Sequence, residues 1–368
     1  MTATPDLLYS AEQDALRGGV RDLLAERSPH TAVLDRIETD TPYDPGLWHA
    51  LAAQIGVAGL AVPEKHGGAG ASWRETAVVA EELGRSVAPT PFLGSAVLAT
   101  AALLALGDDA GGLLGPLAAG ETTAALVLPL STPPGAPFPD AVRADGALTG
   151  RMTSVADVLA AGTLLVPAAG PDGPALFAVA ADQASVTPVA SLDPTRPLAD
   201  VAFDAASGEL LASGAGAERA VAAAVTAGAS MLASEQLGLA EQCLESTVAY
   251  VKERHQFGRP VGSFQALKHR LADVWVSITL ARAAARYAAA CLSSCAADTA
   301  IATAVAASYC GETAVHAAEE CLQLHGGIGF TWEHPAHLYL KRAKADALAL
   351  GAPHRHRAAL APLVDLTL

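Results

Sequence analysis

One long stretch of this chain without a strong helix-stopping residue runs from residue 218 to residue 254. It contains no proline, and its main interruptions are two glycines, Gly228 and Gly238. At 1.5 Å per residue, this stretch predicts a single helix of about 37 residues and roughly 55 Å. A helix of this length, followed by further long helical segments, predicts that the C-terminal part of the chain is an up-and-down bundle.

The segments after this helix support a bundle. The break at Pro260–Gly262 ends the first helix. Ser263 is predicted to cap a second helix, because apolar residues recur at helical spacing from Phe264 to Ile278. Asp298 is predicted to cap a third.

The rest of the chain has two different patterns. Up to about residue 122 the pattern is helical, with a capping box at Ser72 and Glu75. From about 123 to 212, short β-rich runs alternate with turns rich in proline and glycine, which predicts a small barrel or sandwich. The expected fold is therefore mostly α with a central β domain. The expected domains are an N-terminal helical domain at 1–122, a middle β domain at 123–212 and a C-terminal four-helix bundle at 213–368.

Charge and cysteine content exclude several classes of function. The 23 Lys+Arg against 38 Asp+Glu give a net charge of −15, which disfavours nucleic-acid binding. The five cysteines form no CxxC pair and no spacing with histidine that suits a metal, so no metal site is expected. No apolar run approaches the roughly 20 residues that span a bilayer, and no signal peptide is indicated. We expect a cytoplasmic protein without a membrane span.

Four motifs, in order along nearly the whole chain, resemble those of acyl-CoA dehydrogenases. They are residues 56–70, residues 81–85 (EELGR), residues 253–265 (ERHQFGRPVGSFQ) and residues 323–333 (QLHGGIGFTWE). The resemblance implies the fold of that family. It also implies FAD-dependent α,β-dehydrogenation of an acyl-CoA thioester, in which a carboxylate removes the α-proton and flavin N5 accepts the β-hydride.

The motifs of the bundle imply contacts to the adenosine-diphosphate part of FAD. In that family the cofactor lies across a subunit interface, and the neighbouring bundle holds this part. By resemblance, Arg254 reaches the pyrophosphate and Gln265 the adenine end. The alternatives are a solvated arginine at a helix end, a capping or surface glutamine, a core phenylalanine and a helix stop at the glycines. The expected cofactor-binding residues are Arg254, Phe257, Gly258, Gln265, Gln323, Gly326 and Gly327.

The segments that meet the flavin ring in that family are changed in this chain. Where the usual loop is Thr-Glu-Pro-Gly-x-Gly-Ser-Asp, residues 128–135 read LPLSTPPG. Where the family has Trp-Ile-Thr or Trp-Ile-Ser after a glycine, Arg151, Met152 and Thr153 follow Gly150. The sequence therefore provides no aromatic ring to cover the flavin.

The catalytic base is missing as well. The position of the usual glutamate holds Leu350, and the position that a minority of members use, on the first bundle helix, holds Gly228. Neither side chain can abstract a proton. Glu235 lies two turns further along the same helical face and is the remaining candidate, with a helix-packing or surface carboxylate as the alternative.

A complete nucleotide-binding half beside an altered ring-binding half resembles the shorter subunit of heteromeric bacterial acyl-CoA dehydrogenases. The expected partners are a homologous larger subunit in a heterotetramer, an acyl-CoA or acyl-carrier thioester, and an electron-transfer flavoprotein. Two alternatives stay open. One is a homo-oligomeric acyl-CoA or acyl-carrier-protein dehydrogenase-like enzyme of specialised metabolism with an atypical base, and the other is a flavin-free scaffold subunit.

Three rings near the last motif receive no functional role from the sequence. His325 and His334 flank this motif, but their spacing alone predicts neither a metal site nor a catalytic triad. Tyr250, on the first bundle helix, is predicted to pack inside the bundle.

Overall fold

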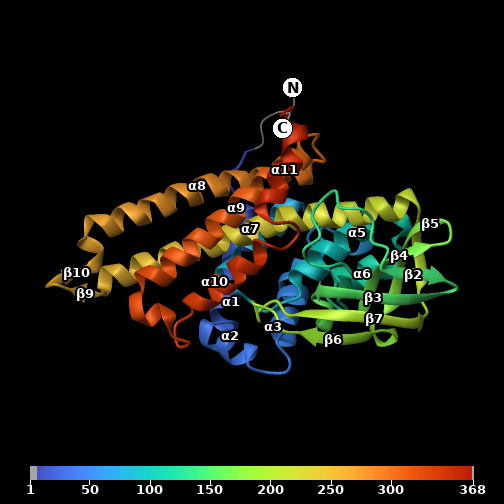
Figure 1. Cartoon of the computed structure of the whole chain (residues 1–368), viewed down its shortest axis with the longest axis horizontal. Coiled ribbons are helices and arrows are strands. Elements are labelled where there is room, and N and C mark those ends of the chain that lie inside the picture. Colours follow the sequence, from blue (N-terminus) through green and yellow to red (C-terminus); the bar gives the residue numbers. More distant parts are fainter. Residues whose placement is uncertain (1–5, 367–368) are drawn as a thin grey trace.

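The computed structural model describes residues 6–366, without the side chains of residues 108, 109 and 111. Helix α7 (Ala215–Glu253) has 39 residues and runs along most of the molecule, from the sheet to the turn formed by β9 and β10 (Figure 1). It is the predicted long helix, which begins three residues earlier and ends one residue sooner than expected. All the other parts of the fold are arranged along it.

The N-terminal region is helical, as predicted. Its capping box is present, because the Ser72 hydroxyl accepts the amide of Arg74 at 3.1 Å and Glu75 accepts the Ser72 amide at 2.8 Å. The helices are α1 (Ala11–Arg27), α2 (His30–Ile37), α3 (Pro45–His49), η1 (Ala50–Ile55), η2 (Val57–Gly59), η3 (Glu64–His66), α4 (Trp73–Ser86), η4 (Phe92–Ala99), α5 (Thr100–Leu104), η5 (Gly107–Leu113) and α6 (Leu114–Ala118).

The middle region forms one mixed sheet in which most neighbouring strands are antiparallel. The strand order is β6-β7-β3-β2-β4-β5-β8, and β1 pairs with β4. The pairs β1–β4 and β2–β4 are parallel. The strands are β1 (Ala124–Leu126), β2 (Val142–Asp145), β3 (Ala147–Ala156), β4 (Thr163–Gly170), β5 (Gly173–Ala180), β6 (Ser185–Val189), β7 (Leu198–Ala206) and β8 (Glu209–Ser213). Short helices η6 (Val158–Ala160) and η7 (Ala181–Gln183) connect some of them.

Alternate residues of the central strands enter two different cores. On β4, Leu164 and Val166 pack in the core of the sheet, whereas Leu165 packs with the N-terminal helices and α7. This follows from the two-residue repeat of a strand, which points successive side chains to opposite faces. The sheet is therefore buried on both faces where it meets the helices.

The C-terminal region is a helical bundle, as predicted. Helix α8 begins at Gln265, directly after Phe264, so the prediction that Ser263 caps it is wrong. Ser263 ends a preceding 3-10 turn, and its buried hydroxyl makes no hydrogen bond with the first amides of the helix or with any other described residue. Asp298 does precede α9, but its carboxylate accepts the Tyr287 hydroxyl instead of a helix amide. The elements are β9 (His255–Gln256), β10 (Arg259–Pro260), η8 (Val261–Ser263), α8 (Gln265–Ser293), α9 (Thr299–Leu324), η9 (Gly326–Phe330), α10 (Ala336–Asp346) and α11 (Pro353–Leu363).

Two glycines bring α4 and α7 into backbone contact. A Cβ atom at Gly84 would lie 2.0 Å from the carbonyl oxygen of Glu235, and one at Gly238 would lie 1.8 Å from that of Glu81. Any side chain at either position would force the two helices apart.

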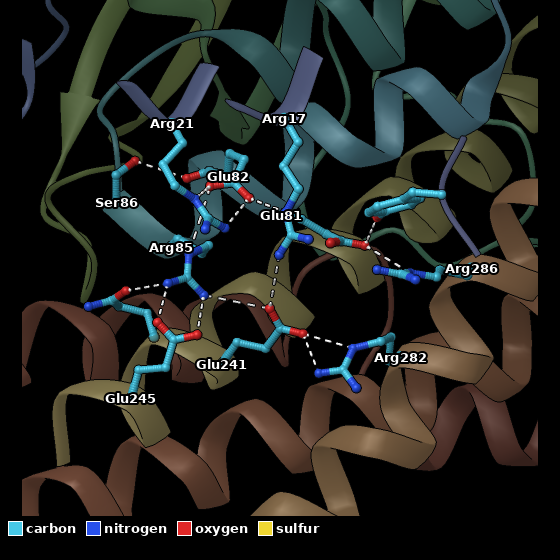
Figure 2. A network of polar contacts seen from close by, with 12 residues as sticks. Arg17, Arg21, Glu81, Glu82, Arg85, Ser86, Glu241, Glu245, Arg282 and Arg286 are labelled. Atoms are coloured by element: carbon cyan, nitrogen blue, oxygen red, sulfur yellow. Dashed lines mark hydrogen bonds and ion pairs between the residues drawn. The ribbon is translucent and has the colours of Figure 1, made fainter. Parts of the chain in front are cut away.

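Ion pairs beside this crossing connect α1, α4, α7 and α8 (Figure 2). Glu82 is 1% exposed and accepts hydrogen bonds from Arg17 at 2.9 Å and from Arg21 at 2.7 and 2.8 Å. Glu241, on α7, accepts two from Arg282 of α8 at 2.7 and 3.0 Å. Because these carboxylates are buried and paired, they fix how the N-terminal helices sit on the bundle.

No helix within residues 6–366 combines the length and the apolar content that crossing a bilayer requires.

Candidate functional site

The residues expected to contact the nucleotide gather at one end of the bundle. Helix α7 ends at Glu253, and α9 ends at Leu324. The two helix ends are neighbours, since the rings of Tyr250 and His325 stack with centroids 4.5 Å apart. The β9–β10 turn and the start of α8 complete this end of the molecule (Figure 1). We call residues 254–265 and 323–327 the nucleotide end.

Three polar side chains of the nucleotide end have no polar partner in the described part of their own chain. Arg254, Gln265 and Gln323 are all exposed. Within residues 6–366, none of these three side chains makes a hydrogen bond or an ion pair. Arg254 is held by its backbone, because its amide donates to the Tyr250 carbonyl at 2.9 Å, while its side chain has no polar partner in that range. These donors are available to a ligand or to another chain.

Phe257 is also exposed, so the alternative that it is a core residue is wrong. Its side chain is 90% exposed and meets Phe264 edge to face, with ring centroids 6.1 Å apart. Its backbone has φ +55°, and Gly258 beside it has φ +75°. The tight two-strand turn requires this left-handed backbone and presents the phenyl ring outward.

The two glycines of the last motif differ in what they require. Gly326 has φ +63° directly after the C-cap of α9, which suits the helix-stop alternative. Gly327 has no positive φ, and a Cβ there would meet no atom within 4 Å. Its backbone is therefore open to close approach by a ligand.

Gly228 and Leu350, the two positions that the resemblance assigns to the base, lie close together in space. A Cβ atom at Gly228 of α7 would lie 2.7 Å from Cδ1 of Leu350 and 2.5 Å from Cδ2 of Leu98. Leu350 is 2% exposed and Leu98 is 7% exposed. Apolar side chains thus fill the point where a carboxylate would stand. We call Leu98, Gly228, Leu350 and residues 128–135 the ring-side junction.

Residues 128–135 close this junction from the side of the sheet. The amide of Leu350 donates to the carbonyl of Leu130 at 2.6 Å. A Cβ at Gly351 would lie 2.8 Å from Cβ of Pro133. The backbone donor next to the base position is therefore already used by the chain itself.

The segment in place of Trp-Ile-Thr also makes contacts of its own. The amide of Leu130 donates to the carbonyl of Ser154 at 3.0 Å, which brings this segment beside residues 128–135. Arg151, at the position of the family's tryptophan, is exposed and pairs with Asp200 of β7 at 2.6 Å. Leu350 and the segment at residues 151–154 therefore both lie beside residues 128–135. The side chains of all three differ from those that the family carries there.

Glu235 lies in a buried ion-pair cluster rather than at the junction. It is 4% exposed, accepts two hydrogen bonds from Arg196 at 2.6 and 2.8 Å, and accepts one from Arg342 at 2.7 Å. Burial raises the pKa of Glu235, but the charges of Arg196 and Arg342 outweigh burial and lower it below its ordinary value. A carboxylate with a lowered pKa and two guanidinium partners is a poor base. These contacts favour the helix-packing alternative.

Sequence reasoning missed the extent of this cluster. Arg342 also pairs with Asp193 at 2.5 Å, and Arg196 also pairs with Asp346. Burial raises the pKa of Asp346 to about 8, although the charge of Arg196 acts in the opposite direction. The cluster joins the loop before β7 to α7 and α10. The signal in the sequence is the turn of residues 193–196, which resembles a turn of the family near the end of the β domain and is predicted to be structural.

No group of three or more His, Cys, Asp or Glu side chains in the described part of the chain could hold a metal ion.

Comparisons with known families and relatives show which proteins this chain is similar to. Residues 10–121 match a family model described as acyl-CoA dehydrogenase, N-terminal domain, and residues 214–362 match acyl-CoA dehydrogenase, C-terminal domain. Acyl-CoA dehydrogenase IpdE2 of Mycobacterium tuberculosis is 40% identical over 342 residues, which cover 93% of this chain and 94% of that protein. Acyl-CoA dehydrogenase FadE34 of the same organism is 34% identical over 362 residues, which cover 96% of this chain but 48% of that protein.

Two solved structures are similar over almost the entire chain. One is a variant of the Tcur3481-Tcur3483 steroid ACAD, with 30% identity, a TM-score of 0.84 and coverage of 96% of this chain and 98% of that one. The other is the ChsE4-ChsE5 complex from Mycobacterium tuberculosis, with 26% identity, a TM-score of 0.87 and coverage of 99% and 100%.

Proposed function

Because the chain belongs to the acyl-CoA dehydrogenase family, we propose that it is the partner subunit of a heteromeric, FAD-dependent acyl-CoA dehydrogenase. In this assignment its nucleotide end holds the adenosine diphosphate of an FAD. The ring pocket and the base of that FAD belong to a larger homologous subunit. The substrate class is an acyl-CoA thioester, and an electron-transfer flavoprotein is the expected electron acceptor.

One observation carries the proposal. Both positions at which this family carries its base lie at the ring-side junction, and Leu98, Gly228 and Leu350 occupy it without a carboxylate. Removal of an α-proton requires a base within hydrogen-bond reach of that proton. Glu235, the remaining candidate, is about 10 Å further along α7 and is held by two guanidinium groups.

The chemistry of the nucleotide end fits the other half of the cofactor. Arg254 presents a free guanidinium, whose planar set of donors matches the oxygens of a pyrophosphate. Gln265 and Gln323 each present an amide that can donate to and accept from an adenosine, and Gly327 leaves room for close contact. The ring-side junction does not fit an isoalloxazine, because it offers neither an aromatic cover nor a free amide at Leu350.

These two halves define what this chain contributes to the reaction. When bound, the flavin accepts the hydride from the β-carbon. The larger subunit's carboxylate takes the α-proton. Arg254, Gln265 and Gln323 bind and orient the cofactor's phosphate and adenosine groups, so that the reactive ring is held by the other subunit.

The lengths and assemblies of the relatives support a heteromer. FadE34 aligns with this chain over 48% of its own length, which leaves a remainder about as long as this chain. One of the similar solved structures is a complex of two differently named chains, ChsE4 and ChsE5. All five cysteines are free thiols, which agrees with assembly in the reducing cytoplasm.

The test is expression of this chain alone and together with a larger homologue that retains the glutamate. We expect little flavin with the chain alone, and one FAD per pair of subunits in the joint preparation. Arg254→Ala should weaken FAD binding by the joint preparation about tenfold or more, because a charge-assisted contact to phosphate is lost. Arg219→Ala is the matched control, because Arg219 is exposed on the same helix but near its opposite end.

Other results would redirect the assignment. A full complement of FAD and thioester oxidation with the chain alone would point to the homo-oligomeric enzyme with an atypical base. FAD binding by the joint preparation that is unaffected by Arg254→Ala would point to the flavin-free scaffold.

A further inference from the structure

Three rings join the two chain segments that form the nucleotide end. The ring of His325 lies between Tyr250 of α7 and His334 of the loop before α10. The centroids of His325 and Tyr250 are 4.5 Å apart with planes at 30°, and those of His325 and His334 are 4.4 Å apart with planes at 45°. His325 is only 3% exposed.

The orientation of the central ring is fixed by a hydrogen bond. Nδ1 of His325 lies 2.6 Å from the carbonyl oxygen of Cys321. A carbonyl can only accept, so the proton is on Nδ1. The same carbonyl also accepts the backbone amide of His325 at 3.2 Å. The carbonyl would therefore keep a partner if the imidazole were replaced, and the stacking is the contact that only a ring can make.

The stack lies where the buried parts of α7 and α9 give way to exposed residues, next to Val251, which is 2% exposed. Residues 252–259 on one segment and residues 326–328 on the other are all exposed. The carbonyl of Tyr250 holds the amide of Arg254, and His325 stands two residues after Gln323. The packing of Tyr250 against His325 therefore contributes to the separation between Arg254 and Gln323, together with the buried contacts between α7 and α9 further along the bundle.

We propose that Tyr250 and His325 are positioning residues for the adenosine diphosphate of FAD. Their stack holds Arg254 on α7 and Gln323 on α9 at the separation that the cofactor spans. This inference rests on the proposed function, since it concerns the same nucleotide end. Neither ring touches the cofactor in this scheme; each acts through the polar residues beyond it.

The test uses the complex of this chain with its larger homologue and measures FAD binding to the flavin-free complex by titration. A stacked aromatic pair contributes a factor of about two to ten in an equilibrium constant. Tyr250→Leu should weaken FAD binding about fivefold to tenfold, whereas Tyr250→Phe keeps the ring and should bind within about twofold of the original chain.

A pair of variants at His325 separates stacking from hydrogen bonding. His325→Phe keeps a ring without a donor and should bind FAD nearly as the original chain does. His325→Asn keeps a short donor without a ring and should weaken FAD binding to the same extent as Tyr250→Leu. His316→Asn is the matched control, because His316 is exposed on the same helix α9 and makes no hydrogen bond, ion pair or ring contact among the described residues.

Two further readouts distinguish positioning from a general loss of structure. The assembled complex, measured by size-exclusion chromatography, and the turnover per bound flavin should be unchanged in all these variants. Equal FAD binding by Tyr250→Leu and Tyr250→Phe would overturn the inference, as would weakened binding that only follows loss of assembly. If Arg254→Ala and the ring variants all leave FAD binding unchanged, the proposed function itself fails. If Arg254→Ala weakens FAD binding but the ring variants leave it unchanged, this inference alone fails.

Discussion

The nucleotide end and the ring-side junction are opposite in exposure, polarity and openness. At the nucleotide end, Arg254, Gln265 and Gln323 are exposed, and their side chains make no hydrogen bond or ion pair within the described chain. At the junction, Leu98 and Leu350 are buried, and both pack against Gly228. The first region is built to meet something outside the chain, and the second is satisfied by the chain itself. Under the proposed function, the chain keeps one half of a shared site while the other half has become part of its core.

Glycines show the same contrast. A Cβ at Gly258, Gly326 or Gly327 would meet no atom within 4 Å. A Cβ at Gly228 or Gly238 would lie less than 3 Å from a neighbouring atom. Packing along α7 thus requires glycine at positions 228 and 238, whereas Gly327 leaves room for a ligand.

The largest effect on the buried side of this comparison is expected from Glu235→Gln. Its carboxylate neutralises Arg196 and Arg342, so the amide would leave two buried guanidinium groups short of charge. The free energy of unfolding should fall by about 3 to 5 kcal/mol, measured by urea denaturation. A loss below about 1 kcal/mol would mean that the cluster is not essential to packing.

Gly238→Ala should have the next largest effect. Its new methyl group would collide with the carbonyl oxygen of Glu81 and separate α4 from α7. We expect a loss of about 3 kcal/mol or an insoluble chain, read from thermal unfolding and soluble yield. Gly327→Ala is the control and should not change stability by more than about 0.5 kcal/mol. Similar losses from both substitutions would remove the contrast between the two regions.

Leu350→Glu tests whether the junction lacks only a base. The new carboxylate would be buried against Leu98, while Leu130 still occupies the neighbouring amide. Stability should fall by about 2 kcal/mol, with no thioester oxidation by the chain alone. Leu350→Met keeps the volume and should cost less than about 1.5 kcal/mol. Appearance of flavin-dependent activity would show that the pocket is still open.

The smallest effect, taken per pH unit, concerns the pH dependence of stability. Burial raises the pKa of Asp346 to about 8, from an unfolded value near 3.8. Between these values the folded chain binds a proton that the unfolded chain has released, so stability should fall as the pH rises toward 8. For one proton the slope is at most about 1.4 kcal/mol per pH unit. Asp346→Asn should reduce this slope of the free energy of unfolding against pH, measured by urea titrations from pH 5 to pH 8. An unchanged slope in the variant would mean that Asp346 is not its origin.

Much of the fold could be predicted from local patterns. The absence of proline from residues 218–254 predicts α7, and the Ser72–Glu75 box predicts the start of α4, because both features depend only on nearby residues. Ser263 was assigned as a cap wrongly, since the sequence does not show that a 3-10 turn comes before α8. The pairing of β4 with both β1 and β2 depends on distant segments and had no local signal.

The site divides in the same way. The motif of residues 253–265 places its exposed residues together, because they belong to one turn. The packing of Leu98 against Gly228 and Leu350 joins residues more than a hundred positions apart, so no spacing rule could reveal it. The same is true of the ion pairs of Glu235, whose partners come from the loop before β7 and from α10.

The bond between the amide of Leu350 and the carbonyl of Leu130 bears on any attempt to engineer this protein. A glutamate introduced at position 350 would still have its backbone amide bonded to the Leu130 carbonyl, so this donor would not be free for a ligand. Under the proposed function, a working base at position 350 would therefore also require changes in residues 128–135 and at Leu98, which pack against this position.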